Sequence, residues 1–193
     1  MFDSLNIFKK PKNSQLSESL DKLSKDYLSS SAIKKIREAI DFADKAHEGQ
    51  FRKSGEPFIT HPINVGLILV SLKMDEDTVI AGLLHDVVED CEIPLSDVKN
   101  RFGNNVSRLV DGVTKLLQLD EKMKDQSQAE HFQKMALATA EDVRVVIIKL
   151  ADRLHNLKTI EHLPRDKQVK KCRETFDLYA PLAHQIGMHK MAT

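Results

Sequence analysis

The sequence has no excess charge of either sign and no apolar run long enough to span a membrane. Its 29 lysine and arginine residues balance 29 aspartate and glutamate residues, whereas a nucleic-acid-binding domain usually has a net positive surface. The most apolar segment, residues 143–154, is interrupted by charged side chains and is far shorter than the ~20 apolar residues of a membrane span. We therefore expect neither nucleic acid nor a membrane as a partner.

Cysteine is also scarce. Cys91 and Cys172 lack C-x-x-C spacing and are too few for a disulfide framework. We expect them to be buried thiols in a reducing compartment, which makes the cytoplasm the expected location. Residues 1–5 do not begin a basic segment followed by a long apolar run, so no secretory signal is predicted.

The length of 193 residues suits one domain of ordinary size. Residues 8–14 are polar, basic and contain a proline, so we expect residues 1–14 to form a flexible leader and residues 15–193 to form the domain. Whether this domain forms a homo-oligomer is left open by the sequence.

Apolar residues recur at helical spacing along most of the chain and no strand pattern competes, which predicts an all-α, compact multi-helix bundle. Residues 52–57 read as a Gly/Pro-containing loop, His61-Pro62 as a helix start, Gly103 as a helix stop, and residues 118–130 as a mobile connection. The expected helices cover residues 31–48, a segment beginning at His61-Pro62, and residues 75–90, 95–102, 105–117, 132–140, 141–158 and 166–180.

The segment His85-Asp86-Val87-Val88-Glu89-Asp90 carries the chemistry. On a continuous helix, its imidazole and three carboxylates share an arc of roughly 140° opposite the aliphatic side chains. Such a cluster repels itself unless a cation or solvent intervenes, and a divalent metal is the strongest compensation.

Two distant residues extend this set. His61 offers a second imidazole, and Asp152 offers a carboxylate from within an apolar helix. Two imidazoles and two carboxylates suit a first-row divalent ion such as manganese, iron or zinc better than calcium. Glu89 then lies close to the metal without being a ligand, where it could orient or deprotonate a water.

Each of these residues also has a purely structural interpretation. A single His-Asp pair is often a solvated helix face, and Asp152 could form a salt bridge with Arg153 or Lys149. Arg52 and Lys53 could be an ordinary exposed basic loop. The remaining histidines are taken as structural or surface residues: His47, His131, His155, His162, His184 and His189.

Several blocks of the sequence, in order, resemble the hydrolase domain of the RelA/SpoT family of alarmone enzymes. The resemblance runs from Ala46 to about Met188. The blocks are Arg52-Lys53-Ser54-Gly55-Glu56-Pro57, Thr60-His61-Pro62, Leu84-His85-Asp86-Val87-Val88-Glu89-Asp90, Leu109-Val110-Asp111-Gly112-Val113-Thr114-Lys115, Lys149-Leu150-Ala151-Asp152-Arg153-Leu154-His155-Asn156 and Tyr179-Ala180-Pro181-Leu182-Ala183-His184.

The resemblance implies an HD-type, manganese-dependent hydrolase that releases pyrophosphate from the 3' position of ppGpp or pppGpp and leaves GDP or GTP. It implies that His61, His85, Asp86 and Asp152 hold the ion, and that Glu89 and Asp90 form an acidic pair that activates the attacking water. It also implies that Arg52 and Lys53 contact the nucleotide. Asn156 and Tyr179 are further candidates, Asn156 for the ribose or phosphate and Tyr179 for closing the pocket, although core packing explains Tyr179 nearly as well.

Long members of the family continue into a synthetase domain, whereas this sequence stops just after the hydrolase-like part. We therefore expect hydrolysis without synthesis, in either a stand-alone small hydrolase or the hydrolase half of a longer enzyme. Adenosine analogues such as ppApp remain alternative substrates. Two other functions also stay open: an HD phosphatase acting on a different phosphorylated nucleotide, and a regulatory module that binds the alarmone without cutting it.

Overall fold

The computed structural model describes residues 13–122 and 142–188, and these residues form helices joined by short loops. They contain no strand, only an isolated antiparallel bridge between Phe51 and Pro57. The helices are α1 (Asn13–Ser24), α2 (Ser30–Ala46), α3 (Thr60–Ser71), α4 (Glu76–Leu83), α5 (Val87–Asp90), α6 (Leu95–Phe102), α7 (Asn104–Lys122), α9 (Val143–Lys158), the 3-10 turn η1 (Ile160–His162), α10 (Arg165–Glu174), the π-turn η2 (Thr175–Tyr179) and α11 (Ala180–Gln185). The predicted all-α fold is confirmed.

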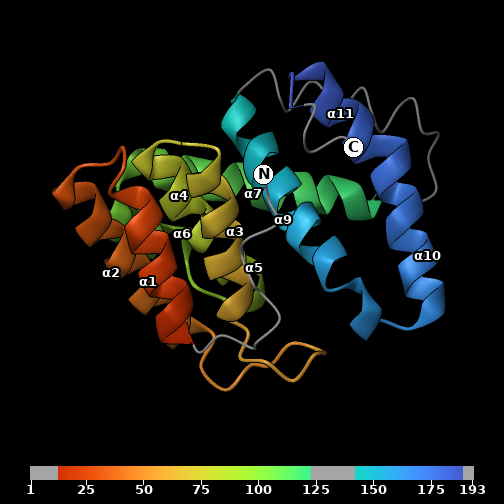
Figure 1. Ribbon diagram of the computed structural model, residues 1–193, viewed down its shortest axis with the longest axis horizontal. Helices are drawn as coiled ribbons and strands as arrows, with labels where there is room; N and C mark the ends of the chain where they lie inside the picture. The colour runs from red at the N-terminus through yellow and green to blue at the C-terminus, as the bar shows by residue number, and fades with distance from the viewer. Residues whose placement is uncertain (1–12, 123–141, 189–193) are drawn as a thin grey trace.

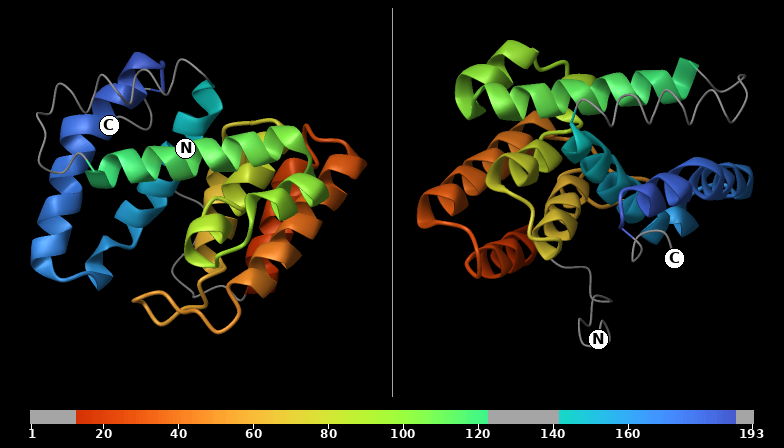
Figure 2. Two further views of the ribbon diagram at one scale, coloured as in Figure 1. Left: turned by 180° about the vertical axis from the view of Figure 1, so that it is seen from behind. Right: turned by 90° about the horizontal axis from the view of Figure 1, so that it is seen from above.

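Helix α3 is central to the part that holds the site. It packs against α1, α4 and α9, while α10 and α11 lie at the opposite end of the molecule from α1 and α2 (Figures 1 and 2). Gly82 lets α4 approach α3 closely, because a Cβ atom there would lie 2.2 Å from Leu69 Cδ1. This close approach sets the start of α3 beside the end of α4.

Local signals in the sequence place most helix ends. Helix α2 begins after Ser29, whose side chain accepts a hydrogen bond from the Ala32 N–H. Helix α6 ends at Gly103, which adopts φ 94°, a backbone conformation that glycine reaches without steric cost. The proline after His61 lies in the first turn of α3, where its missing N–H costs nothing. These predictions are confirmed.

The helix expected over residues 75–90 is wrong, because the structure divides it in two. Helix α4 ends at Leu83 and α5 begins at Val87. His85 Nδ1 lies 2.8 Å from the Gly82 carbonyl oxygen, which in a continuous helix would accept the N–H of Asp86. The arc calculated for one unbroken helix therefore does not apply, since His85 and Asp86 lie in the break.

Three other expected boundaries change. Helix α7 continues to Lys122 instead of ending at residue 117, so residues 118–122 are helical. The rest of the expected connection and the helix expected over residues 132–140 lie outside the described residues, as do residues 1–12 of the expected leader. Helix α1 begins at Asn13, and the last expected helix is divided by the π-turn η2.

Both cysteines are free thiols and half-buried, so the expectation of buried thiols is wrong. Among the described residues, none of the helices combines the length and the apolar character that a membrane crossing requires.

Candidate active site and metal centre

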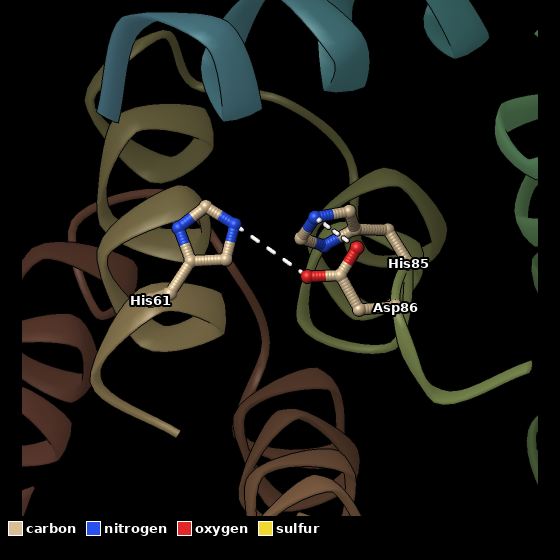
Figure 3. A group of neighbouring side chains, drawn as sticks. All are labelled: His61, His85 and Asp86. Carbon is tan, nitrogen blue, oxygen red and sulfur yellow. Dashed lines mark ion pairs between the residues drawn. The ribbon is translucent and has the colours of Figure 1, made fainter. Parts of the chain in front are cut away.

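The four side chains predicted to bind a metal meet at one point. His61 comes from the first turn of α3, His85 and Asp86 from the break between α4 and α5, and Asp152 from α9. His61 Nε2 lies 3.2 Å from Asp152 Oδ1 and 3.5 Å from Asp86 Oδ2, and His85 Nε2 lies 3.0 Å from Asp86 Oδ1 and 3.9 Å from Asp152 Oδ1. Figure 3 shows the Asp86 carboxylate lying between the two imidazole rings.

The donor atoms in this cluster fit a divalent cation. One ligand atom each from His61, His85 and Asp86 lie within 4.8 Å of one another. The Nδ1 atom of His85 is hydrogen-bonded to the Gly82 carbonyl, as the second nitrogen of a metal-binding histidine usually is. Its Nε2 is fully buried and makes no hydrogen bond, although Asp86 Oδ1 lies 3.0 Å away in an ion-pair contact. A buried nitrogen without a partner is costly, and a bound cation would satisfy it.

The electrostatics of the cluster without an ion show how strongly its carboxylates demand positive charge. Burial disfavours the charged form of His85, but Asp86 and Asp152 outweigh burial and raise the pKa of His85 to about 9. Burial works against the charge on Asp86 too, yet His85 holds the pKa of that carboxyl below its usual range. Burial lowers the pKa of His61, although the neighbouring Asp152 and Asp86 act in the opposite direction.

Asp152 forms the salt bridge with Lys149 that the sequence suggested, and it also faces the other candidate metal ligands. Its Oδ2 receives a hydrogen bond from the buried ammonium of Lys149 at 2.8 Å, and its Oδ1 faces the imidazoles. Burial opposes ionisation of Asp152, but Lys149 and His61 hold its pKa well below its usual range. Arg153, the other suggested partner, pairs instead with Glu174 at 3.1 Å.

His155, interpreted from the sequence as structural or on the surface, is part of this site. Its Nδ1 lies 2.7 Å from His61 Nδ1, and it is buried. Burial, then the neighbouring His61 and Arg52, lower its pKa to about 3, so the ring is neutral. Its position three residues after Asp152 was the available signal, because residues at that spacing share a helix face.

The predicted acidic pair lies on the short helix α5. Glu89 and Asp90 are both exposed, directly after the break that carries Asp86. Burial and then the charge of Asp86 raise the pKa of Asp90. Asp90 is therefore within electrostatic reach of the metal cluster, and both carboxylates are open to solvent.

A pocket opens beside the cluster and contains three of the four residues predicted to contact a substrate. Arg52, Lys53 and Asn156 line it. The Arg52 guanidinium donates to Asn156 Oδ1 at 3.0 Å and to Thr159 Oγ1 at 3.2 Å, and Asn156 Nδ2 donates to Asp152 Oδ1 at 2.5 Å. A chain of hydrogen bonds thus joins the pocket to the metal cluster.

The other residues lining the pocket were not predicted from the sequence. They mix aromatic, apolar and hydrogen-bonding groups, a lining suited to a planar base with polar edges. These residues are Phe51, Ser54, Phe58, Thr159, His162, Leu163 and Lys171. A spacing of three from Asn156 to Thr159 was the one local signal.

Tyr179, the fourth predicted substrate contact, is not among the residues lining this pocket, and its proposed role stays a prediction. Its side chain is buried, with 2% exposed, and the Arg153 guanidinium lies over its ring at 4.2 Å from the centroid. Core packing and this cation–π contact account for the residue.

The characteristic sequence profile of the HD domain matches residues 39–189. The chain therefore belongs to the HD-domain family, in agreement with an all-helical fold and a buried cluster of histidine and aspartate.

Comparison with known proteins also confirms the resemblance to the RelA/SpoT family. The chain is 48% identical over 178 residues to "Bifunctional (p)ppGpp synthase/hydrolase SpoT" of Escherichia coli (strain K12), covering 92% of this chain and 25% of that protein. It is 52% identical over 162 residues to "GTP pyrophosphokinase" of Streptomyces coelicolor, covering 84% of this chain and 19% of that protein. The chain thus spans a quarter or less of these relatives' length.

A solved structure of similar size has the same fold. It is described as a metazoan ortholog of SpoT that hydrolyses ppGpp, and it superposes with a TM-score of 0.59 at 30% sequence identity. The match covers 78% of this chain and 86% of the solved one.

Proposed function

We propose that the chain hydrolyses the 3'-pyrophosphate of the alarmone nucleotides ppGpp and pppGpp in a reaction that depends on a divalent metal, manganese in the first instance. One observation carries the proposal. A buried cluster of two histidines and two aspartates adjoins a pocket lined by Arg52, Lys53 and Asn156, and hydrogen bonds link the two. The names of the relatives supply the substrate class.

His61, His85, Asp86 and Asp152 would hold the ion. The set of two nitrogen and two carboxylate donors, together with the unpartnered Nε2 of His85, supports this assignment. When bound, the ion would act as a Lewis acid that neutralises charge developing on the phosphoryl oxygens.

The protein's own groups would position the reactants and move the proton. Glu89 and Asp90, exposed at the edge of the cluster, orient the attacking water and accept its proton. The raised pKa of Asp90 brings it closer to the range useful for a general base. Arg52 and Lys53 hold the anionic nucleotide, with Asn156 linking Arg52 to the metal ligand Asp152.

The bonding changes are those of a simple hydrolysis. The water oxygen forms a bond to the phosphorus attached to the ribose 3'-oxygen, and the bond between that phosphorus and the 3'-oxygen breaks. The 3'-oxygen takes up a proton, and pyrophosphate leaves as one unit with GDP or GTP as the other product.

The experiment is product analysis on ppGpp and ppApp, with manganese and with chelator. We expect pyrophosphate plus GDP or ADP, and no turnover after chelation. Orthophosphate in place of pyrophosphate would refute the bond assigned. Nucleotide binding without turnover would instead identify a binding module.

Variants separate the proposed roles. Asp86→Asn and Asp152→Asn should lose metal and activity together, because each removes a charged ligand. Glu89→Gln should keep metal binding and lose most turnover, about 10²-fold or more for a general base. Unchanged turnover in Glu89→Gln would contradict its role.

A further inference from the structure

The buried imidazole rings of His61 and His155 are joined by one hydrogen bond between their Nδ1 atoms. His61 Nδ1 and His155 Nδ1 lie 2.7 Å apart, and the rings are tilted by 41° with centroids 4.9 Å apart. A hydrogen bond between two imidazole nitrogens needs one N–H donor and one bare acceptor. One of the two Nδ1 atoms therefore carries the hydrogen and the other does not.

The contact made by His61 Nε2 decides which of the two Nδ1 atoms carries the hydrogen. Without an ion, His61 Nε2 lies 3.2 Å from Asp152 Oδ1, a contact that a neutral ring satisfies by donating Nε2–H. Its Nδ1 is then bare and accepts from His155. With an ion in the cluster, Nε2 must offer its lone pair, so the hydrogen of His61 moves to Nδ1 and needs an acceptor behind it.

We propose that His155 is a positioning residue for the metal ligand His61, reversing its Nδ1 from hydrogen-bond donor to acceptor when the ion binds. This inference rests on the proposed metal-dependent function. His155 thereby stabilises the His61 tautomer that leaves Nε2 free for the ion.

An imidazole suits this position better than the carboxylate or carbonyl that more commonly supports a metal-binding histidine. A carboxylate can only accept, and it would add negative charge to a cluster that already contains Asp86 and Asp152. A lysine or arginine can only donate. A neutral imidazole can both donate and accept, so a hydrogen bond to His61 Nδ1 persists in both states.

A matched pair of variants tests the acceptor. His155→Asn keeps an oxygen acceptor the same number of bonds from Cα as Nδ1, and His155→Leu has nearly the same shape without an acceptor. Manganese binding is measured by titration calorimetry without nucleotide, and circular dichroism checks the fold. We expect the Leu variant to bind manganese about 10–100-fold more weakly and the Asn variant to bind within about threefold of the unsubstituted protein.

Turnover separates positioning from catalysis. Because His155 acts through His61, saturating manganese should restore the Leu variant's kcat toward that of the unsubstituted protein, while the manganese concentration for half-maximal rate stays raised. Equal manganese affinity in the Leu variant and the unsubstituted protein would overturn the inference.

A measurement on the unsubstituted protein does not depend on how the variants fold. Nitrogen-15 spectra of the histidine rings report which nitrogen carries the hydrogen, with diamagnetic Zn²⁺ in place of manganese. We expect His61 Nε2–H and His155 Nδ1–H in chelator, and His61 Nδ1–H and His155 Nε2–H with Zn²⁺. Unchanged tautomers would overturn this inference alone, whereas failure of the unsubstituted protein to bind any divalent ion would overturn the proposed function as well.

Discussion

Lys149 is a buried cation whose removal should matter far more without metal than with it. Its ammonium lies 2.8 Å from Asp152 Oδ2, and its side chain is 5% exposed. Lys149→Met keeps the apolar stem but leaves a buried carboxylate uncompensated, and breaking such a pair costs about 3–5 kcal/mol. Asp152 retains hydrogen bonds from His61 and Asn156, so we expect the lower end, about 3 kcal/mol.

The bound ion should recover most of this loss, because it supplies the positive charge that Lys149 no longer provides. With manganese present we expect a cost of about 1 kcal/mol, since the ion compensates the carboxylate from its other side. The loss of stability is thus about 2 kcal/mol smaller with manganese than without it. By the thermodynamic cycle, Lys149→Met should therefore bind manganese about 30-fold more tightly than the unsubstituted protein.

Thermal scans and titration calorimetry measure both quantities. A protein of this size shifts its Tm by about 2–4 °C per kcal/mol, so Lys149→Met should melt about 6–12 °C lower in chelator and about 2–4 °C lower in manganese. Lys115→Met is the matched control, because Lys115 pairs with Asp111 on the exposed surface and should cost about 0.5 kcal/mol or less in both conditions. Equal losses with and without metal, together with unchanged manganese affinity, would refute the assignment of Asp152 to the ion.

Three further predictions address pH, the pocket and the packing. The raised pKa of His85, about 9 against ~6.5 in an unfolded chain, stabilises the metal-free protein fully below about pH 6.5. This contribution is lost as the pH rises toward 9. Manganese affinity requires neutral His85, so it should rise nearly tenfold per pH unit from pH 7 to 8. Calorimetry that showed a pH-independent affinity would contradict this. Arg52→Met should raise KM for ppGpp about 10–100-fold, since a hydrogen bond to a charged group contributes about 1.5–3 kcal/mol, with the exposed Arg165→Met as control; equal KM values would exclude Arg52 from binding. Gly82→Ala should destabilise the protein by about 1–3 kcal/mol in urea unfolding, because its Cβ would meet Leu69; an unchanged midpoint would show that Leu69 can move aside.

Helix ends and core faces were predictable because they depend on neighbouring residues. The stop at Gly103 and the start at His61-Pro62 are local chemistry. The apolar residues at helical spacing on α7 are buried: Val106, Leu109, Val110 and Val113. The four candidate metal ligands could also be picked out from the sequence. Asp152, for example, is a carboxylate inside an apolar helix and so requires a partner.

The break between α4 and α5 was not predictable from periodicity. The aliphatic spacing continues through it, while His85 Nδ1 contacts the Gly82 carbonyl that a continuous helix would use. Contacts between distant segments were equally inaccessible: His155 meets His61 across 94 positions, and Arg52 meets Asn156 across 104. For Tyr179 the sequence allowed both core packing and a contact with substrate, and its ring is buried against the Arg153 guanidinium.

The distribution of the metal cluster along the chain sets the order in which it can be completed during synthesis. A nascent polypeptide that has emerged only through α7 carries His61, His85 and Asp86 but lacks α9, with Asp152, its counter-charge Lys149 and the supporting ring of His155. The group of His61, His85 and Asp86 is therefore available before α9 is made, and it gains its second carboxylate and supporting side chains only when α9 docks.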